Sequence, residues 1–169
     1  MKITLLTATL VFGLMRVVAQ NPEGFDTKCN HYIAGTVPLS YPAQLYSILK
    51  SPNTVVLDAR EKNEFDVSHI KKAIYIGFDQ FNKEGLNSIS KSDSIYIYCS
   101  VGYRSEKIGE KLIELGYKNV FNLYGGIFNW VNSGYNVVDN SNTIVKEVHG
   151  YDKEWSRLLN NKRCSIILN

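Results

Sequence analysis

One short segment brings together a cysteine, a glycine and an arginine at a spacing that suits nucleophilic chemistry. Cys99 stands after the apolar run 94–98, and Gly102 and Arg104 follow it before an amphipathic segment begins. A turn between a strand and a helix directs successive backbone N–H groups into one concavity, which attracts an anion. The helix N-terminus adds about half a positive charge, and Arg104 is expected to add a full one. Such a turn favours the thiolate of Cys99, the nucleophilic form of a cysteine.

A second polar pair lies where another expected strand ends. Asp58 closes the β-branched run 54–58, and Arg60 follows it. Ligands of open α/β sheets bind beyond the carboxyl ends of the strands, so this pair and the Cys99 segment are expected at the same edge. The pair has two interpretations, a structural ion pair or a support for the site, and buried pairs often serve structure rather than rate.

Alternating strands and helices position both groups. Apolar β-branched runs predict strands, and apolar residues at helical spacing predict helices. Strands are expected at 54–58, 73–76, 94–99 and 119–123, and helices at 42–49, 79–89, 105–115 and 125–132. Gly116 suits the position just past the end of the third helix. The alternation predicts an α/β fold with a central parallel sheet and helices on both faces.

Composition narrows the class of protein. Of the 169 residues, 44% are hydrophobic and 21% charged, so the chain can bury a core. The net charge of +3 comes without a basic run of five, and nucleic acid is therefore not a predicted partner. The three cysteines form neither a Cys-x-x-Cys motif nor a Cys/His cluster, so the sequence predicts no metal.

The N-terminal segment is typical of an export signal. Lys2 precedes the mostly apolar run 3–15, and Val17-Val18-Ala19 offers small or modest residues for cleavage near Ala19 or Gln20. An uncleaved membrane anchor is the alternative, but Arg16 interrupts a run that needs about 20 apolar residues to span a bilayer. We therefore expect a signal peptide at 1–19, a secreted or periplasmic protein and no stable membrane span.

Three ordered segments resemble one family. They are VVLDAREKNEFDVSHIKKAIYI, IYIYCSVGYRSEKIGEKLIELGY and VFNLYGGIFNWVNSGYNVV, and together they are similar to a single-domain rhodanese. The resemblance covers residues 36–139 and implies the rhodanese-like α/β fold. It leaves an N-terminal arm at 20–35 and a C-terminal tail at 140–169, in which a short helix is expected at 152–160.

The resemblance implies a sulfurtransferase that needs no cofactor. Cys99 would take sulfane sulfur from a small anion such as thiosulfate, or from a persulfide, and pass it to a thiol or cyanide. The residues expected to surround the persulfide are Ser100, Val101, Gly102, Tyr103, Arg104 and Ser105. Asp58 and Arg60 would support the rim of the active site, with Glu64 as a further candidate. Ser100 and Val101 stand where thiosulfate-preferring relatives often carry a basic residue. An organic persulfide or a protein partner is therefore an equally open choice.

Two other functions are compatible with this pattern. Phosphatases and arsenate reductases of related fold carry an extra residue in the loop, whereas here four residues separate Cys99 from Arg104. A sulfur-carrying or protein-binding module without turnover is the other alternative, although inactive relatives usually lose the cysteine.

Cys29 and Cys164 lie outside the matching segments, one in each extension. In an oxidising compartment they could form a disulfide that joins the arm to the tail. They could equally stay free, pair with another molecule, or resolve an oxidised Cys99. Spacing alone does not choose between these alternatives.

Overall fold

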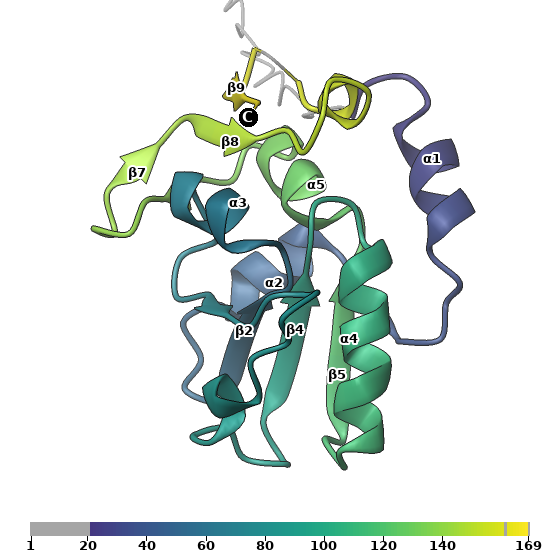
Figure 1. The fold of residues 1–169 in the computed structure, drawn as a ribbon, viewed down its shortest axis with the longest axis vertical. Helices are drawn as coiled ribbons and strands as arrows, with labels where there is room; N and C mark the ends of the chain where they lie inside the picture. Colours follow the sequence, from purple (N-terminus) through teal and green to yellow (C-terminus); the bar gives the residue numbers. More distant parts are fainter. Residues whose placement is uncertain (1–20, 161, 169) are drawn as a thin grey trace, which may run out of the picture.

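The computed structural model describes residues 21–160 and 162–168 (Figure 1). The signal peptide predicted at 1–19 lies outside the described residues, so cleavage and export stay predictions. In the described part of the chain, no helix has the length and apolar character needed to cross a membrane.

A five-stranded parallel sheet forms the centre of the fold. Its strand order is β1-β5-β4-β2-β3, with bounds β1 Leu39–Ser40, β2 Thr54–Asp58, β3 Ile74–Tyr75, β4 Ser94–Tyr98 and β5 Asn119–Leu123. The central strand β4 pairs with β2 from Thr54↔Ser94 to Asp58↔Tyr98. This register places the ends of β2 and β4 at one edge of the sheet, as the sequence predicted.

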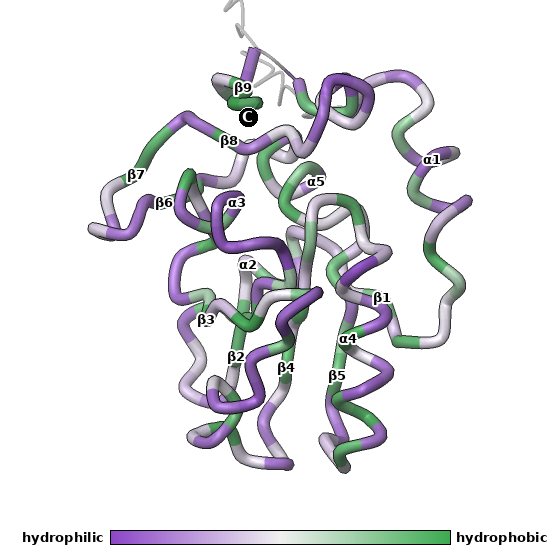
Figure 2. Tube along the Cα trace, viewed as in Figure 1, coloured by the Kyte–Doolittle hydropathy of each residue, from purple (hydrophilic) through white to green (hydrophobic). Residues whose placement is uncertain are grey.

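Helices cover both faces of the sheet (Figure 1). The helices are α1 Phe25–Tyr32, α2 Pro42–Ile48, α3 Lys62–Val67, α4 Tyr103–Glu114 and α5 Gly126–Asn132, with the 3-10 helices η1 Lys83–Leu86 and η2 Trp155–Leu158. One core lies between the sheet and α4 and contains Ile97 and Ile108. The other lies against α2 and α5 and contains Leu45, Tyr98 and Phe128. Figure 2 shows much of the strands in green, whereas α4 alternates between green and purple along its turns, as a half-buried helix does.

The predicted elements in the domain are present, with one correction. The segment 79–89 was expected to be a helix, but only the four residues of η1 are helical. Asn82 has an extended backbone, and its side chain accepts a hydrogen bond from Glu84 N at 3.0 Å. A short amide side chain that bonds locally competes with helical hydrogen bonds, which explains why the segment does not continue as an α-helix.

The arm and the tail are more structured than the sequence indicated. The arm contains α1, which buries Phe25 and Cys29 in the core beside α5. The tail contains β8 Glu147–His149 and β9 Ser165–Ile167, which pair in parallel, while β6 Val137–Val138 pairs with β7 Ile144–Val145. The helix expected at 152–160 is the 3-10 helix η2. Both extensions therefore pack on the domain near the edge where β4 ends (Figure 1).

Candidate functional site

Cys99 lies at the carboxyl end of β4, in the loop that leads into α4. Its side chain is 1% exposed. The helix begins at Tyr103, two residues before the expected start, because Gly102 has a φ of 121° and turns the chain directly into it. Side chains rarely adopt this φ, so the position favours glycine, and an added Cβ would also push against Ile33 Cδ1 at 2.6 Å.

One backbone donor and one hydroxyl group lie close to the Cys99 sulfur. Gly102 N donates a hydrogen bond to Sγ at 3.1 Å, and the buried Ser105 Oγ lies 3.5 Å from Sγ. Asn122 on β5 fixes this arrangement, because its Nδ2 donates to Gly102 O at 2.9 Å and its Oδ1 lies 2.7 Å from Ser105 Oγ. The thiol therefore faces the N-terminal turn of α4, as the sequence predicted.

Arg104 is held by a buried carboxylate. Its Nη1 and Nη2 donate to Glu64 Oε2 and Oε1 at 2.6 and 2.8 Å, and Nη2 also donates to Ser100 Oγ at 2.9 Å. Glu64 is 2% exposed and lies at the third position of α3. The sequence predicted that Arg104 would add a full positive charge to the anion-attracting turn. Instead, Glu64 neutralises Arg104, and the two residues join α3 to the loop.

The environment of Glu64 favours its ionised form. Burial raises the pKa of this carboxyl group, but the hydrogen bonds and charge of Arg104, with the charge of Arg60, outweigh burial and bring the pKa down to about 2. Burial likewise disfavours the charge on Arg104, and the hydrogen bonds that Arg104 donates to Glu64 more than restore it, so the pKa of Arg104 is raised. The pair is therefore ionised across the physiological range.

Asp58 and Arg60 form a separate, fully buried ion pair. Arg60 Nε and Nη2 donate to the Asp58 carboxylate at 3.0 and 2.7 Å, and Nη2 also donates to Ser68 O at 2.7 Å. Among the described residues, neither Asp58 nor Arg60 lines the cavity over Cys99. The pair ties the end of β2 to the turn after α3, which agrees with its structural interpretation.

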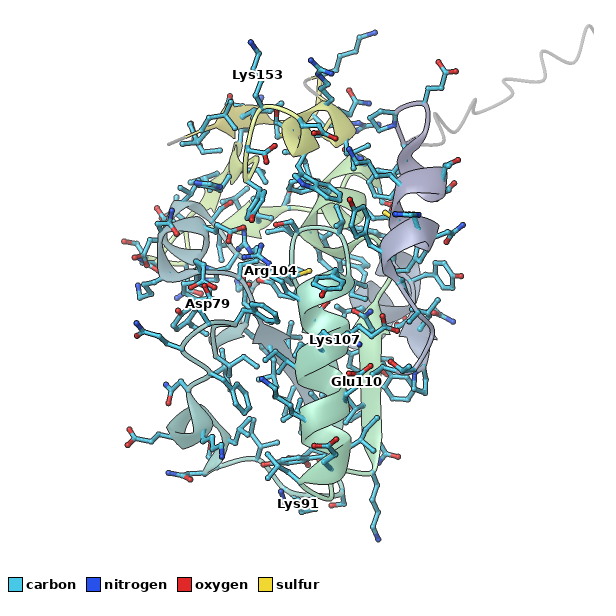
Figure 3. All side chains as sticks on the ribbon, turned by 45° about the vertical axis from the view of Figure 1, so that its right-hand side comes forward. Asp79, Lys91, Arg104, Lys107, Glu110 and Lys153 are labelled. Carbon is cyan, nitrogen blue, oxygen red and sulfur yellow. The ribbon has the colours of Figure 1, made fainter. Side chains whose placement is uncertain are left out.

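A cavity of about 520 Å³ opens over Cys99. The residues that line it are Tyr32, Glu61, Phe78, Asp79, Cys99, Ser100, Val101, Tyr103, Arg104, Tyr151 and Trp155. Figure 3 shows Arg104 above the N-terminal end of α4, with Asp79 on the loop to its left. The cavity gives Cys99 an opening for small molecules despite its low exposure.

The other two cysteines are free thiols buried in the core. Burial, with the charges of Asp26 and Cys99, raises the pKa of Cys29 to about 12. Burial alone raises the pKa of Cys164 to about 11. In this structure neither forms the disulfide that the sequence left open, and both are held in the protonated, poorly nucleophilic form.

Helix α5 supports the Cys99 loop through two backbone hydrogen bonds. Ile127 N donates to Cys99 O at 2.9 Å, and Phe128 N donates to Ser100 O at 3.2 Å. These bonds require close approach, because a Cβ at Gly126 would lie 2.2 Å from Cys99 O and 2.7 Å from the Ser100 carbonyl carbon.

We expect Gly126→Ala to destabilise the protein by about 3 kcal/mol, since backbone atoms on both sides must move and φ is positive. Gly116→Ala is the matched control, because Gly116 has a φ of 87° but nothing within 4 Å of an added Cβ. It should lose only about 1 kcal/mol. Urea unfolding of both variants checks this, and equal losses would show that the contact with the loop does not matter.

Sequence reasoning located the loop but not the whole site. It named Glu64 only as a possible rim residue. In the structure Glu64 belongs to a capping box at the start of α3, where its Oε2 accepts a hydrogen bond from Glu61 N at 3.0 Å. It did not find Tyr32, Tyr151 and Trp155, which reach the cavity from the extensions. Among the residues that the structure describes, no group of three or more His, Cys, Asp or Glu side chains could hold a metal ion.

Comparison with known proteins identifies one family. A family model described as a rhodanese-like domain matches residues 41–133. The tRNA uridine(34) hydroxylase of Bacillus mycoides is 36% identical over 94 residues, and the match covers 50% of this chain and 28% of that protein. The chain thus spans less than a third of the length of this relative, and the comparison concerns the shared segment alone.

Solved structures agree with this result. A rhodanese-related protein from Thermoplasma volcanium superposes with a TM-score of 0.53 at 30% identity, covering 60% of this chain and 97% of that one. A rhodanese-like domain from Anabaena has a TM-score of 0.56 at 25% identity, covering 60% of this chain and 79% of that one. Both likenesses agree with the rhodanese-like α/β fold that the sequence predicted.

Proposed function

Because this chain belongs to the rhodanese-like domain family, we propose that it transfers sulfane sulfur through a persulfide on Cys99. The observation that carries the proposal is the position of the Cys99 sulfur, which accepts a hydrogen bond from Gly102 N at the start of α4 and faces an open cavity. The donor is thiosulfate or a persulfide, and the acceptor is a thiol, cyanide or a protein thiol.

The loop supplies the electrostatic stabilisation that this reaction needs. The Cys99 thiolate attacks the outer sulfur of the donor, and the bond between that sulfur and the donor's remaining atoms breaks. Its electron pair leaves with the donor fragment. The persulfide on Cys99 carries negative charge, and fixed N–H dipoles at a helix N-terminus stabilise such charge without reorganisation. An acceptor thiolate or cyanide then takes the outer sulfur, and the Cys99 thiolate returns.

The Arg104–Glu64 pair has a positioning role in this proposal. Because both terminal guanidinium nitrogens already bind Glu64, Arg104 fixes the shape of the loop rather than binding the donor directly. This geometry also argues against phosphate or arsenate chemistry, in which an arginine of the loop must be free to bind the oxygens of the substrate.

Sulfur loading tests the proposal directly. We expect incubation with thiosulfate or an alkyl persulfide to add the mass of one sulfur atom to the peptide that contains Cys99. Cyanide should then remove it as thiocyanate. Repeated cycles would distinguish an enzyme from a carrier that loads once. Phosphate esters and arsenate serve as controls. Their turnover, with no sulfur added to Cys99, would contradict the proposal.

A further inference from the structure

The extensions on either side of the family match build a wall over the Cys99 cavity. Tyr32 lies at the end of α1, and Tyr151 and Trp155 lie in the tail, all outside residues 41–133. The Tyr32 ring lies 5.0 Å from the Trp155 ring and 6.3 Å from the Tyr103 ring. The cavity therefore has an aromatic wall that the core domain alone does not provide.

The wall is anchored rather than loosely attached. The ammonium of Lys28 on α1 pairs with Glu154 and lies 4.6 Å from the centre of the Trp155 ring, which joins the arm to the tail. The arm is also fixed by Phe25, which is 1% exposed, and by Tyr124 Oη, which lies 3.0 Å from both Asp26 Oδ1 and Asn30 Oδ1. A wall with buried anchors can select between substrates.

The charge that faces the cavity is negative. Two of the residues that line it, Glu61 and Asp79, are carboxylates. Arg104 is the one cation among the described lining residues, and Glu64 takes up its charge. A small dianion such as thiosulfate would therefore meet like charges at the entrance. An ammonium group would meet the two carboxylates and the aromatic side chains of Tyr32 and Trp155, both of which attract cations. The centre of the Tyr151 ring already lies 5.1 Å from the guanidinium carbon of Arg104.

We propose that the natural donor is an organic persulfide that carries an ammonium group, and not a small sulfur oxyanion. This inference rests on the proposed function. The thiolate of Cys99 attacks the outer sulfur of R–S–SH, the bond between the two donor sulfurs breaks, and the electron pair leaves on R–S⁻. Cys99 then carries the –S–SH group, so the step balances without an oxidant. The organic group R stays among Tyr32, Tyr151 and Trp155.

Donors of matched size and different charge test this inference. We would measure the second-order rate of persulfide formation on Cys99 with 2-aminoethyl, propyl and 2-carboxyethyl persulfides, and with thiosulfate. We expect the ammonium donor to react at least about 10-fold faster than the carboxylate donor, a preference of about 1.4 kcal/mol. The propyl donor should lie between them, and thiosulfate should be the slowest.

Two variants assign the preference to the proposed groups. Asp79→Asn removes an exposed carboxylate at the cavity and should reduce the ratio of ammonium to carboxylate rates by about 3-fold, whereas Glu114→Gln, at the far end of α4, should not change it. Trp155→Leu keeps an apolar side chain but removes the aromatic face. It should reduce the rate of the ammonium donor more than that of the propyl donor. Tyr46→Leu, an exposed aromatic away from the cavity, is its control.

The outcomes separate this inference from the proposed function. If Cys99 loads with sulfur but thiosulfate or the carboxylate donor is the fastest, the inference is wrong and the sulfurtransferase proposal stands. If the ratio is unchanged in both Asp79→Asn and Trp155→Leu, the wall does not select the donor. If no donor loads Cys99, both proposals fail.

Discussion

Cys99→Ser should lower sulfur transfer by more than about 1,000-fold, because a serine hydroxyl forms neither the nucleophilic thiolate nor a persulfide. The fold should be preserved, since the hydroxyl is slightly smaller than the thiol and can accept the hydrogen bond that Gly102 N donates to Sγ. We expect the free energy of unfolding to change by about 1 kcal/mol. Thiocyanate formation from an alkyl persulfide and cyanide measures the activity, and urea unfolding measures the stability.

Cys164→Ser is the control for this experiment. Cys164 is also a buried thiol, but burial raises its pKa to about 11, and it does not line the Cys99 cavity. This variant should retain both the activity and the sulfur loading of the unmodified protein. If transfer persisted in Cys99→Ser and disappeared in Cys164→Ser, the reactive cysteine would be Cys164 and not Cys99.

The parts of the site that lie close together in the sequence could be predicted from it. The apolar run that ends at Tyr98 and the helical spacing after Gly102 define the strand, the loop and the helix, because both patterns depend on neighbouring residues. The parallel register of β2 and β4 then places Asp58 and Cys99 at the same edge, as the alternation of strands and helices required.

The contacts between distant segments could not be predicted in the same way. Glu64 and Arg104 are 40 residues apart, and only the packing of α3 over the loop brings them together. The position of Trp155 depends on the anchoring of the tail against α1, which no local pattern encodes. The helix α1 itself was missed because its apolar positions Phe25, Cys29 and Tyr32 are few within a polar arm. Long-range packing therefore determines the surroundings of the nucleophile, while local sequence determines the nucleophile itself.

Glu64→Gln should destabilise the protein by about 3 kcal/mol or more. The amide cannot balance the charge of Arg104, and removing one partner of a buried pair leaves an uncompensated charge that typically costs about 3–5 kcal/mol. The shift of the Glu64 pKa from its usual 4.5 to about 2 gives a similar figure of about 3 kcal/mol. The sulfur-transfer activity should also fall, because Glu64 holds both Arg104 and Ser100 of the Cys99 loop. The control is Glu110→Gln, which affects the half-exposed pair of Lys107 and Glu110 on one face of α4 (Figure 3) and should have a much smaller effect.

The pH dependence of this loss identifies its cause. The folded pKa of Glu64 lies below the unfolded value, so its contribution to stability is fully present above about pH 4.5 and is lost as the pH falls through about 2. The difference in unfolding free energy between the unmodified protein and Glu64→Gln should therefore be constant from neutral pH down to about pH 5 and shrink from there toward pH 2. Urea unfolding at a series of pH values measures this difference. A difference that does not change over this range would mean that Glu64 acts through its shape and hydrogen bonds alone, and not through its charge beside Arg104.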